Sequence, residues 1–133
     1  MIDATRPCVY SAEDVLAEQL GDPDVRMRWE RLAPARAVAL RLVAYRIEHG
    51  LTQTALGRLL GMAQPAVARL ESGEHVPSLD TLVRLADALD IEFLVDITPK
   101  RRRTSWVSRR ARGATVVETV TTDKGGRLLV AAS

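Results

Sequence analysis

Four side chains near the start of one predicted helix have the chemistry to contact DNA bases. The helix is predicted over residues 64–72, and the side chains are those of Gln64, Pro65, Ala66 and Arg69. Glutamine can bond bidentately to adenine and arginine to guanine, while proline or alanine can touch a thymine methyl group. On an exposed helix face, such residues could enter a major groove and distinguish one base pair from another.

A preceding helix and a tight turn are needed to present this face. Thr52 can cap a first helix whose buried side is Leu56 and Leu60. Gly61 is expected to end that helix, because glycine adopts the left-handed conformation without steric cost. Pro65 suits the first turn of the second helix, where its missing N–H is not needed. The pattern predicts a DNA-binding helix-turn-helix; the alternative is an ordinary helical hairpin with a polar exposed face.

Residues beside the second helix complete the candidate DNA-binding set. Gln53, at a helix N-terminus, could sit with backbone N–H groups on a phosphate, or it could be a solvated first-turn residue. Arg69 could contact a base edge, a phosphate, or an acidic side chain along the helix surface. His75, in the following loop, could touch the DNA backbone or simply be exposed. The additional members of the set are Thr52, Gln53, Ala63 and His75.

The same segment resembles a known family of DNA-binding proteins. Over residues 36–98 the chain looks like the Xre/Cro helix-turn-helix family of phage and bacterial repressors. The resemblance implies a mainly α, lambda-repressor-like domain of five helices, binding of operator DNA, and a structural role for Glu71. It is carried by Thr52-Gln53, Leu56, Gly61, Gln64, Val67, Leu70-Glu71, Gly73, Pro77-Ser78, Leu82, Leu85-Ala86 and Leu89.

An upstream run resembles the HigA-type antitoxins of this family, which are the repressor halves of toxin–antitoxin pairs. The resemblance implies a second partner, a small basic ribonuclease toxin. The residues that carry it are Asp22-Pro23-Asp24, Trp29-Glu30 and Leu32-Ala33-Pro34-Ala35-Arg36.

Three positions depart from the family pattern. Ala63 stands where the family usually has a Ser or Thr cap, a loss that typically costs about 1 kcal/mol. Gly57 replaces a usual alanine, which permits close helix approach but costs about 1 kcal/mol in helix propensity. Ala68 stands where a polar residue often reaches the DNA. We therefore expect fewer side-chain contacts to DNA than in a typical member.

Length and composition limit the class of protein. A chain of 133 residues fits one domain with flanking arms, and 47% hydrophobic with only 4% aromatic residues predicts a core of Leu, Val and Ala. No apolar run approaches the ~20 residues of a membrane span. The polar, acidic start predicts no signal peptide, and the single cysteine, Cys8, excludes an internal disulfide and suits the cytoplasm.

The residues that enzymes and metal sites require are not grouped in this sequence. Two separated histidines and one cysteine do not make a metal site. No nucleophile–base set and no glycine-rich phosphate loop is recognisable. The sequence therefore predicts a non-enzyme with no cofactor, no metal and no small-molecule substrate.

Charge is strongly segregated along the chain. Residues 1–35 carry a net charge of −3, residues 36–99 carry −2, and residues 100–133 carry +7. A negative net charge on the core is unfavourable for DNA binding, because phosphate contacts supply most non-specific affinity. The basic tail could make up this deficit.

The N-terminal arm, residues 1–34, is predicted to hold two helices. Ser11 and Asp14 form a capping box at the start of the first, which extends to Leu20. The second runs from residue 24 to residue 32. Its Trp29 is either a core anchor or a contact for a partner.

The domain at residues 35–98 is predicted to begin with a long helix, residues 35–49, before the two motif helices. Ser78 caps a last helix, residues 79–89. The core face of that helix is predicted to be Leu79, Leu82, Leu85, Ala86 and Leu89. A strand follows at residues 92–97, and it needs a partner from a second subunit or from the tail.

Residues 99–133 form a basic linker and a tail. The run Lys100–Arg112 holds 7 basic residues in 13 and is a solvated linker, a DNA-backbone contact or a protease-sensitive segment. Trp106 within it favours a binding element. Residues 115–122 and 127–132 predict a β-hairpin, with a disordered tail that orders on a partner as the alternative.

Together these features predict a homodimeric repressor that binds a palindromic operator, with the 64–72 helices in successive major grooves. The HigA resemblance implies an antitoxin that autoregulates its operon and holds its toxin by the acidic arm or the tail. The alternatives are a free-standing phage-type regulator, and a protein-interaction adaptor with a vestigial helix-turn-helix. RNA binding by the tail alone is a further alternative, although the chain lacks the aromatic platforms of single-strand binders.

Overall fold

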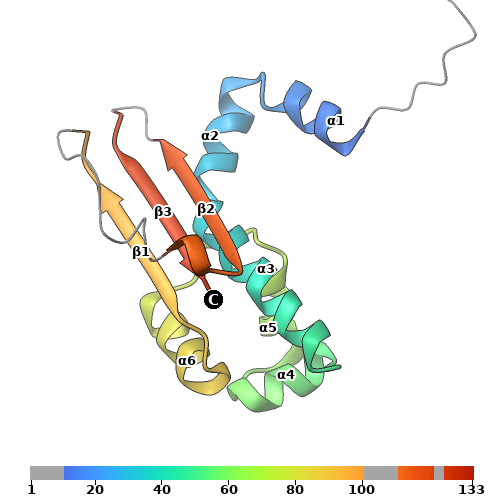
Figure 1. Cartoon of the computed structure of the whole chain (residues 1–133). Helices are drawn as coiled ribbons and strands as arrows, with labels where there is room; N and C mark the ends of the chain where they lie inside the picture. Colours follow the sequence, from blue (N-terminus) through green and yellow to red (C-terminus); the bar gives the residue numbers. More distant parts are fainter. Residues whose placement is uncertain (1–10, 101–110, 122–124) are drawn as a thin grey trace, which may run out of the picture. The chain divides into compact units, whose positions relative to one another are not determined.

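The computed structural model describes residues 11–100, 111–121 and 125–133 (Figure 1). Internal contacts divide the chain into two compact units, Met1–Arg31 and Leu32–Ser133, which are considered separately below. The expectations that concern Cys8, Trp106 and most of the basic run at residues 100–112 lie outside the described residues.

From residue 11 onward, the first unit contains two short helices, α1 (Ala12–Gln19) and α2 (Pro23–Arg31). The predicted capping box is present: the Asp14 backbone N–H donates to Ser11 Oγ at 3.1 Å, and Ser11 Oγ donates to the Asp14 carboxylate at 2.8 Å. The Ser11 hydroxyl and the Ser11 backbone N–H both donate to the Asp14 carboxylate, and these two hydrogen bonds lower the pKa of Asp14 below its ordinary value. Trp29 remains 37% exposed, and neither helix buries a residue, so the core interpretation of Trp29 is not supported.

The second unit is built on four helices, α3 (Ala33–Glu48), α4 (Gln53–Leu60), α5 (Gln64–Glu71) and α6 (Leu79–Leu89). Each helix supplies an apolar side chain to one core, and burying such a side chain contributes about 1.5–3 kcal/mol. The largest fully buried side chains are Leu42, Leu56, Leu85, Val38 and Val67.

The predicted caps of α4 and α6 are present, whereas α3 begins two residues before its predicted start at residue 35. The Thr52 hydroxyl accepts a hydrogen bond from the Ala55 N–H at 3.1 Å, and the Ser78 hydroxyl accepts one from the Thr81 N–H at 3.2 Å. Pro34 lies in the first turn of α3 and therefore begins the helix without kinking it.

Leu79 was expected on the core face of α6, and the structure contradicts this. The side chain is 77% exposed, whereas Leu85 and Leu89 of the same helix are buried. Leu79 is the first residue of α6, and only the later turns of the helix pack against the core.

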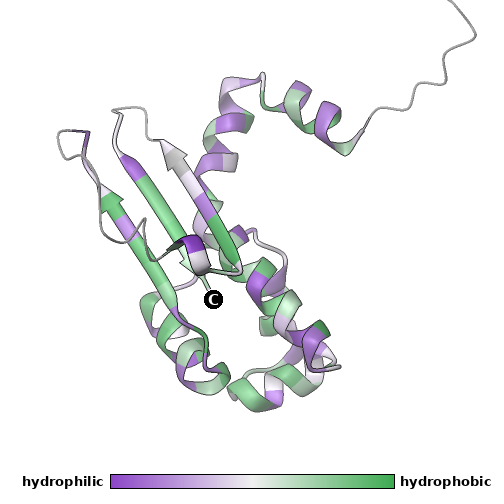
Figure 2. Ribbon diagram, viewed as in Figure 1, coloured by the Kyte–Doolittle hydropathy of each residue, from purple (hydrophilic) through white to green (hydrophobic). Residues whose placement is uncertain are grey.

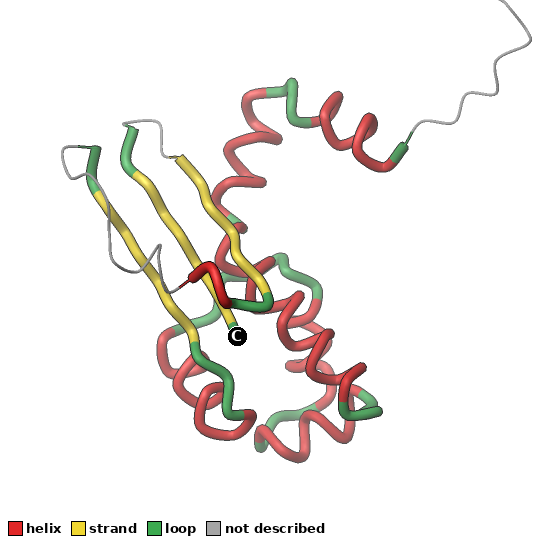
Figure 3. Tube along the Cα trace, viewed as in Figure 1, coloured by secondary structure: helices red, strands yellow, loops and turns green. Residues whose placement is uncertain are grey.

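The C-terminal part of the second unit forms a three-stranded antiparallel sheet in the order β1-β3-β2. Its strands are β1 (Phe93–Thr98), β2 (Val116–Thr121) and β3 (Arg127–Ala132), and they lie side by side in Figure 3. The predicted hairpin is thus present, and the tail supplies β3 as the partner that β1 needs.

The sheet packs against the helical core. Ala132 at the end of β3 belongs to the same buried cluster as Val38 and Leu42 of α3. A short 3₁₀ helix, η1 (Ala111–Gly113), contributes Ala111 to a second small cluster with Leu129 and Ala131 of β3. Figure 2 shows hydrophobic residues along most of β1 and β3, as this burial requires.

The expected fold class is confirmed: a mainly helical helix-turn-helix domain with an N-terminal helical extension and a small C-terminal β element. The count of helices in the domain differs, since the described residues of the second unit contain four α-helices and not five. The segment after α6 is the strand β1, as predicted for residues 92–97, because its Phe-Leu-Val run favours extended backbone. No helix in the described part of the chain is long and apolar enough to cross a membrane.

Candidate nucleic-acid interface

The α4–turn–α5 unit presents the predicted contact face to solvent. Gly61 ends α4 in the left-handed conformation, at φ +63°, and α5 begins three residues later. Val67 of α5 is fully buried and anchors the helix on the core. The exposed residues of α5 include the four predicted base contacts, Gln64, Pro65, Ala66 and Arg69.

Gly57 allows the turn to approach α4 closely. A Cβ atom at this position would lie 2.6 Å from the Met62 carbonyl oxygen, a distance at which the backbone must shift. The Met62 N–H also donates to the Gly57 carbonyl at 2.8 Å. The absence of a side chain at residue 57 therefore lets the backbone of the turn pack directly against α4.

Ala63 begins α5 without a side-chain hydrogen bond, as its residue type requires. Its φ of −70° and ψ of 150° are nevertheless the extended geometry of a helix N-cap. Pro65 occupies the first turn and loses no helical hydrogen bond there. The start of α5 is therefore held by its proline and its packing, and not by a capping side chain.

A chain of hydrogen bonds runs from α3 to the start of α5. Arg46 Nε donates to Glu71 Oε1 at 2.8 Å, and Gln53 Nε2 donates to Glu71 Oε2 at 2.8 Å. Gln64 Nε2 in turn donates to Gln53 Oε1 at 2.8 Å. Arg46 also donates to the Leu51 carbonyl at 3.1 Å. The bonds to Glu71 raise the pKa of Arg46.

This chain determines how Gln64 is oriented. An ionised Glu71 can only accept, so Gln53 must turn its NH₂ group toward it and its carbonyl toward Gln64. Gln64 then offers one N–H to Gln53 and keeps its Oε1 and second N–H available. An acceptor and a donor side by side are the pair that recognises the N6 and N7 atoms of adenine.

The structure changes the interpretation of two residues outside the base-contact set. Gln53 is not a freely solvated first-turn residue, because both ends of its amide are hydrogen bonded to protein. Glu71 has the structural role that the family resemblance implied, since it pairs with Arg46 and Gln53. The sequence pattern did not predict Arg46, which is spaced as one more residue of an amphipathic helix.

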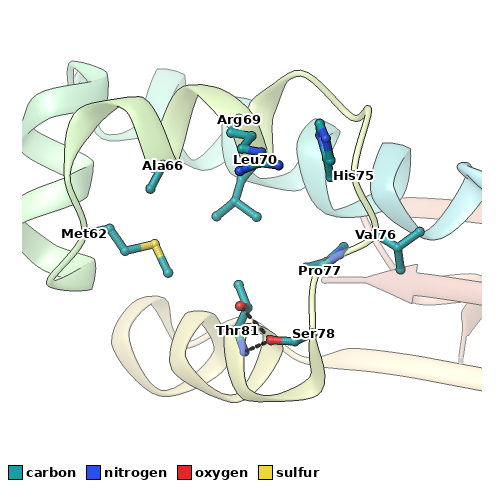
Figure 4. A pocket seen from close by; sticks show the side chains of 9 residues that line it. All are labelled: Met62, Ala66, Arg69, Leu70, His75, Val76, Pro77, Ser78 and Thr81. Atoms are coloured by element: carbon teal, nitrogen blue, oxygen red, sulfur yellow. Dashed lines mark hydrogen bonds between the residues drawn. The ribbon is translucent and has the colours of Figure 1, made fainter.

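Ala66, Arg69 and His75 surround one pocket of about 370 Å³ (Figure 4). It lies between α5, the loop after it and the start of α6. The Ser78 and Thr81 side chains are hydrogen bonded to each other on the α6 side, at 3.0 Å between their hydroxyl oxygens. The other residues that line the pocket are Met62, Leu70, Val76, Pro77, Ser78 and Thr81.

Arg69 lies at the edge of this pocket and is exposed. Within the described residues it forms no ion pair, so the alternative of a salt bridge along the helix surface is not observed. His75 is exposed on the adjoining loop. Thr52 is exposed at the start of α4, where its hydroxyl is occupied as the helix cap.

The described residues contain no group of three or more His, Cys, Asp or Glu side chains that could hold a metal ion. The polar groups of the α4–α5 region are mainly amide, guanidinium and hydroxyl groups.

Comparison with known proteins identifies the same segment. Residues 42–95 match a helix-turn-helix family model. This range begins within α3, includes α4, α5 and α6, and ends within β1.

The chain is also similar to curated proteins. It is 30% identical over 99 residues to Antitoxin HigA1 from two strains of Mycobacterium tuberculosis, CDC 1551 and H37Rv; the match covers 73% of this chain and 64% of those proteins. It is 39% identical over 49 residues to an uncharacterized HTH-type transcriptional regulator of Haemophilus influenzae, covering 37% of this chain and 50% of that protein. The chain thus spans less than two thirds of the length of these relatives. No solved structure matches it.

Proposed function

Because the chain carries an Xre-type helix-turn-helix domain and resembles HigA1 antitoxins, we propose that it is a homodimeric, sequence-specific transcriptional repressor that serves as an antitoxin. The observation that carries the DNA-binding part is the exposed N-terminal face of α5, held in position by the Arg46–Glu71–Gln53–Gln64 chain. Its partners are operator DNA and a small basic toxin.

In the proposed complex, each copy places α5 in a major groove of the operator. Two such helices must lie about 34 Å apart, one helical turn of B-DNA, on a palindromic site. Gln64 contacts adenine and Arg69 contacts guanine, while Pro65 and Ala66 touch thymine methyl groups.

The residues around α5 hold the register on the phosphate backbone. Thr52 and Gln53 bring the N-terminus of α4, with its free backbone N–H groups, to a phosphate. Ala63 is small enough for the start of α5 to approach the DNA closely, and His75 reaches the backbone from the loop. Gln53 has the additional task of orienting Gln64.

The decisive experiment is fluorescence anisotropy of the purified protein on the DNA upstream of its own gene, against scrambled DNA, at two salt concentrations. A repressor binds the upstream DNA selectively and loses affinity as salt rises. Equal, weak binding to both DNAs would contradict a DNA-binding function and favour the adaptor with a vestigial motif.

The antitoxin part rests on the similarity to HigA1 and on the net charge of −3 of residues 1–35, which suits a basic toxin. It is tested by co-expressing the protein with the product of a neighbouring small basic open reading frame. We expect the full chain to rescue growth and the chain without residues 1–31 to fail to do so. Rescue by the deleted form would exclude the arm as the contact, and the absence of any rescue would favour the free-standing regulator.

A further inference from the structure

The outer edge of β1 carries no partner strand within the described part of the chain. The sheet order β1-β3-β2 leaves β1 at one edge and β2 at the other. An exposed strand edge presents a row of backbone N–H and C=O groups that can pair with another chain.

The register of β1 on β3 determines which residues present these groups. The Ser133 N–H donates to the Glu92 carbonyl at 3.1 Å, and Glu92 precedes β1 by one residue. In an antiparallel pair the residues alternate between bonding inward and outward. The backbone groups of Phe93, Val95 and Ile97 therefore point away from β3.

The side chains of these three residues are apolar and lie on one face of the sheet, because they alternate along the strand. Val95 is 47% exposed and Ile97 is 78% exposed, while Phe93 is partly buried against the helical core. The charged residue of the strand, Asp96, is on the opposite face and pairs with Arg127 at 2.9 Å. The face of β1 that carries the side chains of Phe93, Val95 and Ile97 is therefore uncharged.

The opposite edge of the sheet is different. By the same alternation, β2 points the backbone groups of Val117, Thr119 and Thr121 outward, and two of these are polar. A second exposed apolar set lies at the start of α6, at Leu79 and Val83, but it offers side chains alone. Among the described residues, the β1 edge carries two exposed apolar side chains on outward-bonding residues, Val95 and Ile97, whereas the β2 edge carries one, Val117 at 45%.

We propose that β1 pairs antiparallel with β1 of a second copy of this chain, around a twofold axis at Val95. This register places Val95 opposite Val95 of the second copy and Ile97 opposite its Phe93. The outward-pointing backbone N–H and C=O groups of all three residues then form hydrogen bonds across the two strands. A twofold at Asp96 would instead place two carboxylates opposite each other, which is unfavourable. The result is a continuous six-stranded sheet that joins the two copies.

This inference rests on the homodimer of the proposed function and specifies its surface. The pairing covers Ile97, the most exposed apolar side chain among those of the sheet whose burial is described, against the margin of the other copy's helical core. It uses no residue of the α4–α5 contact face. Dimer formation is therefore measurable in the absence of DNA.

The test is the oligomeric state of the full-length chain by analytical ultracentrifugation across a concentration series, for the wild type and for Ile97→Lys. A lysine at the edge is expected to raise the dimer dissociation constant about tenfold or more. Ile47→Lys is the matched control, because Ile47 is 71% exposed on α3 and undergoes the same change of charge and shape. It is expected to dimerise as the wild type does.

A monomeric wild type, or an Ile97→Lys variant that dimerises normally, would overturn the proposal. Loss of the dimer in Leu79→Lys but not in Ile97→Lys would assign the interface to α6. If the wild type binds its operator selectively and the Ile97→Lys variant still dimerises normally, only the β1 interface is contradicted and the proposed function stands. If Ile97→Lys abolishes the dimer but the wild type shows no selectivity for its operator, only the DNA-binding function is contradicted and the β1 interface stands.

Cross-linking tests the register. In a Cys8→Ser background, cysteines at residue 95 of the two copies would face each other with Cα atoms about 5.5 Å apart. A short bifunctional maleimide is expected to link Val95→Cys into a covalent dimer and to leave Val117→Cys, on the other edge, mainly monomeric. Equal cross-linking of the two variants would contradict pairing at Val95.

Discussion

The side-chain amide of Gln53 lies between Glu71, which accepts a hydrogen bond from its NH₂ group, and Gln64, which donates one to its carbonyl. This position gives Gln53 a role in orienting Gln64. The side chain of Gln64 is therefore oriented before DNA arrives, which lowers the entropy that is lost on binding.

A double-mutant cycle measures this orientation. Gln53→Ala is expected to weaken operator binding by about 0.5–1.5 kcal/mol, the net value of one hydrogen bond, because Gln64 becomes free to rotate. Gln64→Ala weakens binding through the lost base contact. In the double variant the losses should be less than additive, as measured by anisotropy on the operator. Strict additivity would mean that Gln53 acts independently of Gln64, for example through phosphate.

Arg69 is the residue whose removal should alter specificity most directly. It is exposed and unpaired within the described residues, so Arg69→Ala removes no ion pair seen in the structure. We expect a loss of about 1–3 kcal/mol at the operator and relaxed preference at one base pair. Arg58→Ala, which removes the same charge from an exposed position on α4, is the control. Uniform weakening across all DNA sequences would assign Arg69 to phosphate.

At the scale of elements, the α4–α5 crossing depends on a missing side chain. In Gly57→Ala the new Cβ would meet the Met62 carbonyl oxygen at 2.6 Å. Such overpacking costs about 1–3 kcal/mol, against a gain of up to about 1 kcal/mol in helix propensity. We expect a net loss of stability in chemical denaturation. Gly113→Ala is the control, because its Cβ would meet nothing within 4 Å. Equal stability of both variants would show that the turn relaxes without cost.

The start of α5 offers the opposite experiment. Ala63 has the extended backbone of an N-cap but no side-chain oxygen. Ala63→Ser is expected to raise the free energy of unfolding by about 0.5–2 kcal/mol, since its hydroxyl can accept an N–H of the first turn. Thr52→Ala, which removes the observed cap of α4, should lower it by a similar amount. Thermal denaturation of both variants measures these changes in stability. If Ala63→Ser is no more stable than the wild type, Pro65 already compensates for the missing cap.

At the scale of the whole molecule, the C-terminal hairpin is part of the domain's core and not an appendage. Ala132 of β3 belongs to the cluster that contains Leu42 and Leu56, and Arg36 of α3 pairs with Glu118 of β2 at 3.4 Å. A chain that ends at residue 99 loses these contacts and leaves β1 without β3. We expect its melting temperature to fall by several degrees or more, because about 1 kcal/mol shifts the midpoint by 4–8 °C in a small domain.

Deletion of residues 1–31 is the comparison for that truncation. These residues form a separate compact unit, so the second unit should unfold at nearly the same temperature without them. Equal destabilisation by the two deletions would contradict the division of the chain into these units.

Local features of the sequence predicted the elements well, because helix ends depend on a few neighbouring residues. Ser11 with Asp14, Thr52 and Ser78 have the capping hydrogen bonds that their spacing implied. The exposed face of α5 followed from the polar and small residues at its start, among them Gln64, Ala66 and Arg69. The hairpin at the end of the chain followed from its two predicted strand segments, residues 115–122 and 127–132.

Tertiary structure decided the relations between these elements. The exposure of Leu79 and the pairing of β3 with both β1 and β2 depend on residues far apart in the chain. The same is true of Glu71, which accepts hydrogen bonds from both Arg46 and Gln53. The spacing of Gln53 and Gln64 showed two candidate contact residues, but only packing placed one amide against the other. A sequence pattern thus determines which groups each element presents, while the distances between elements determine which of those groups meet.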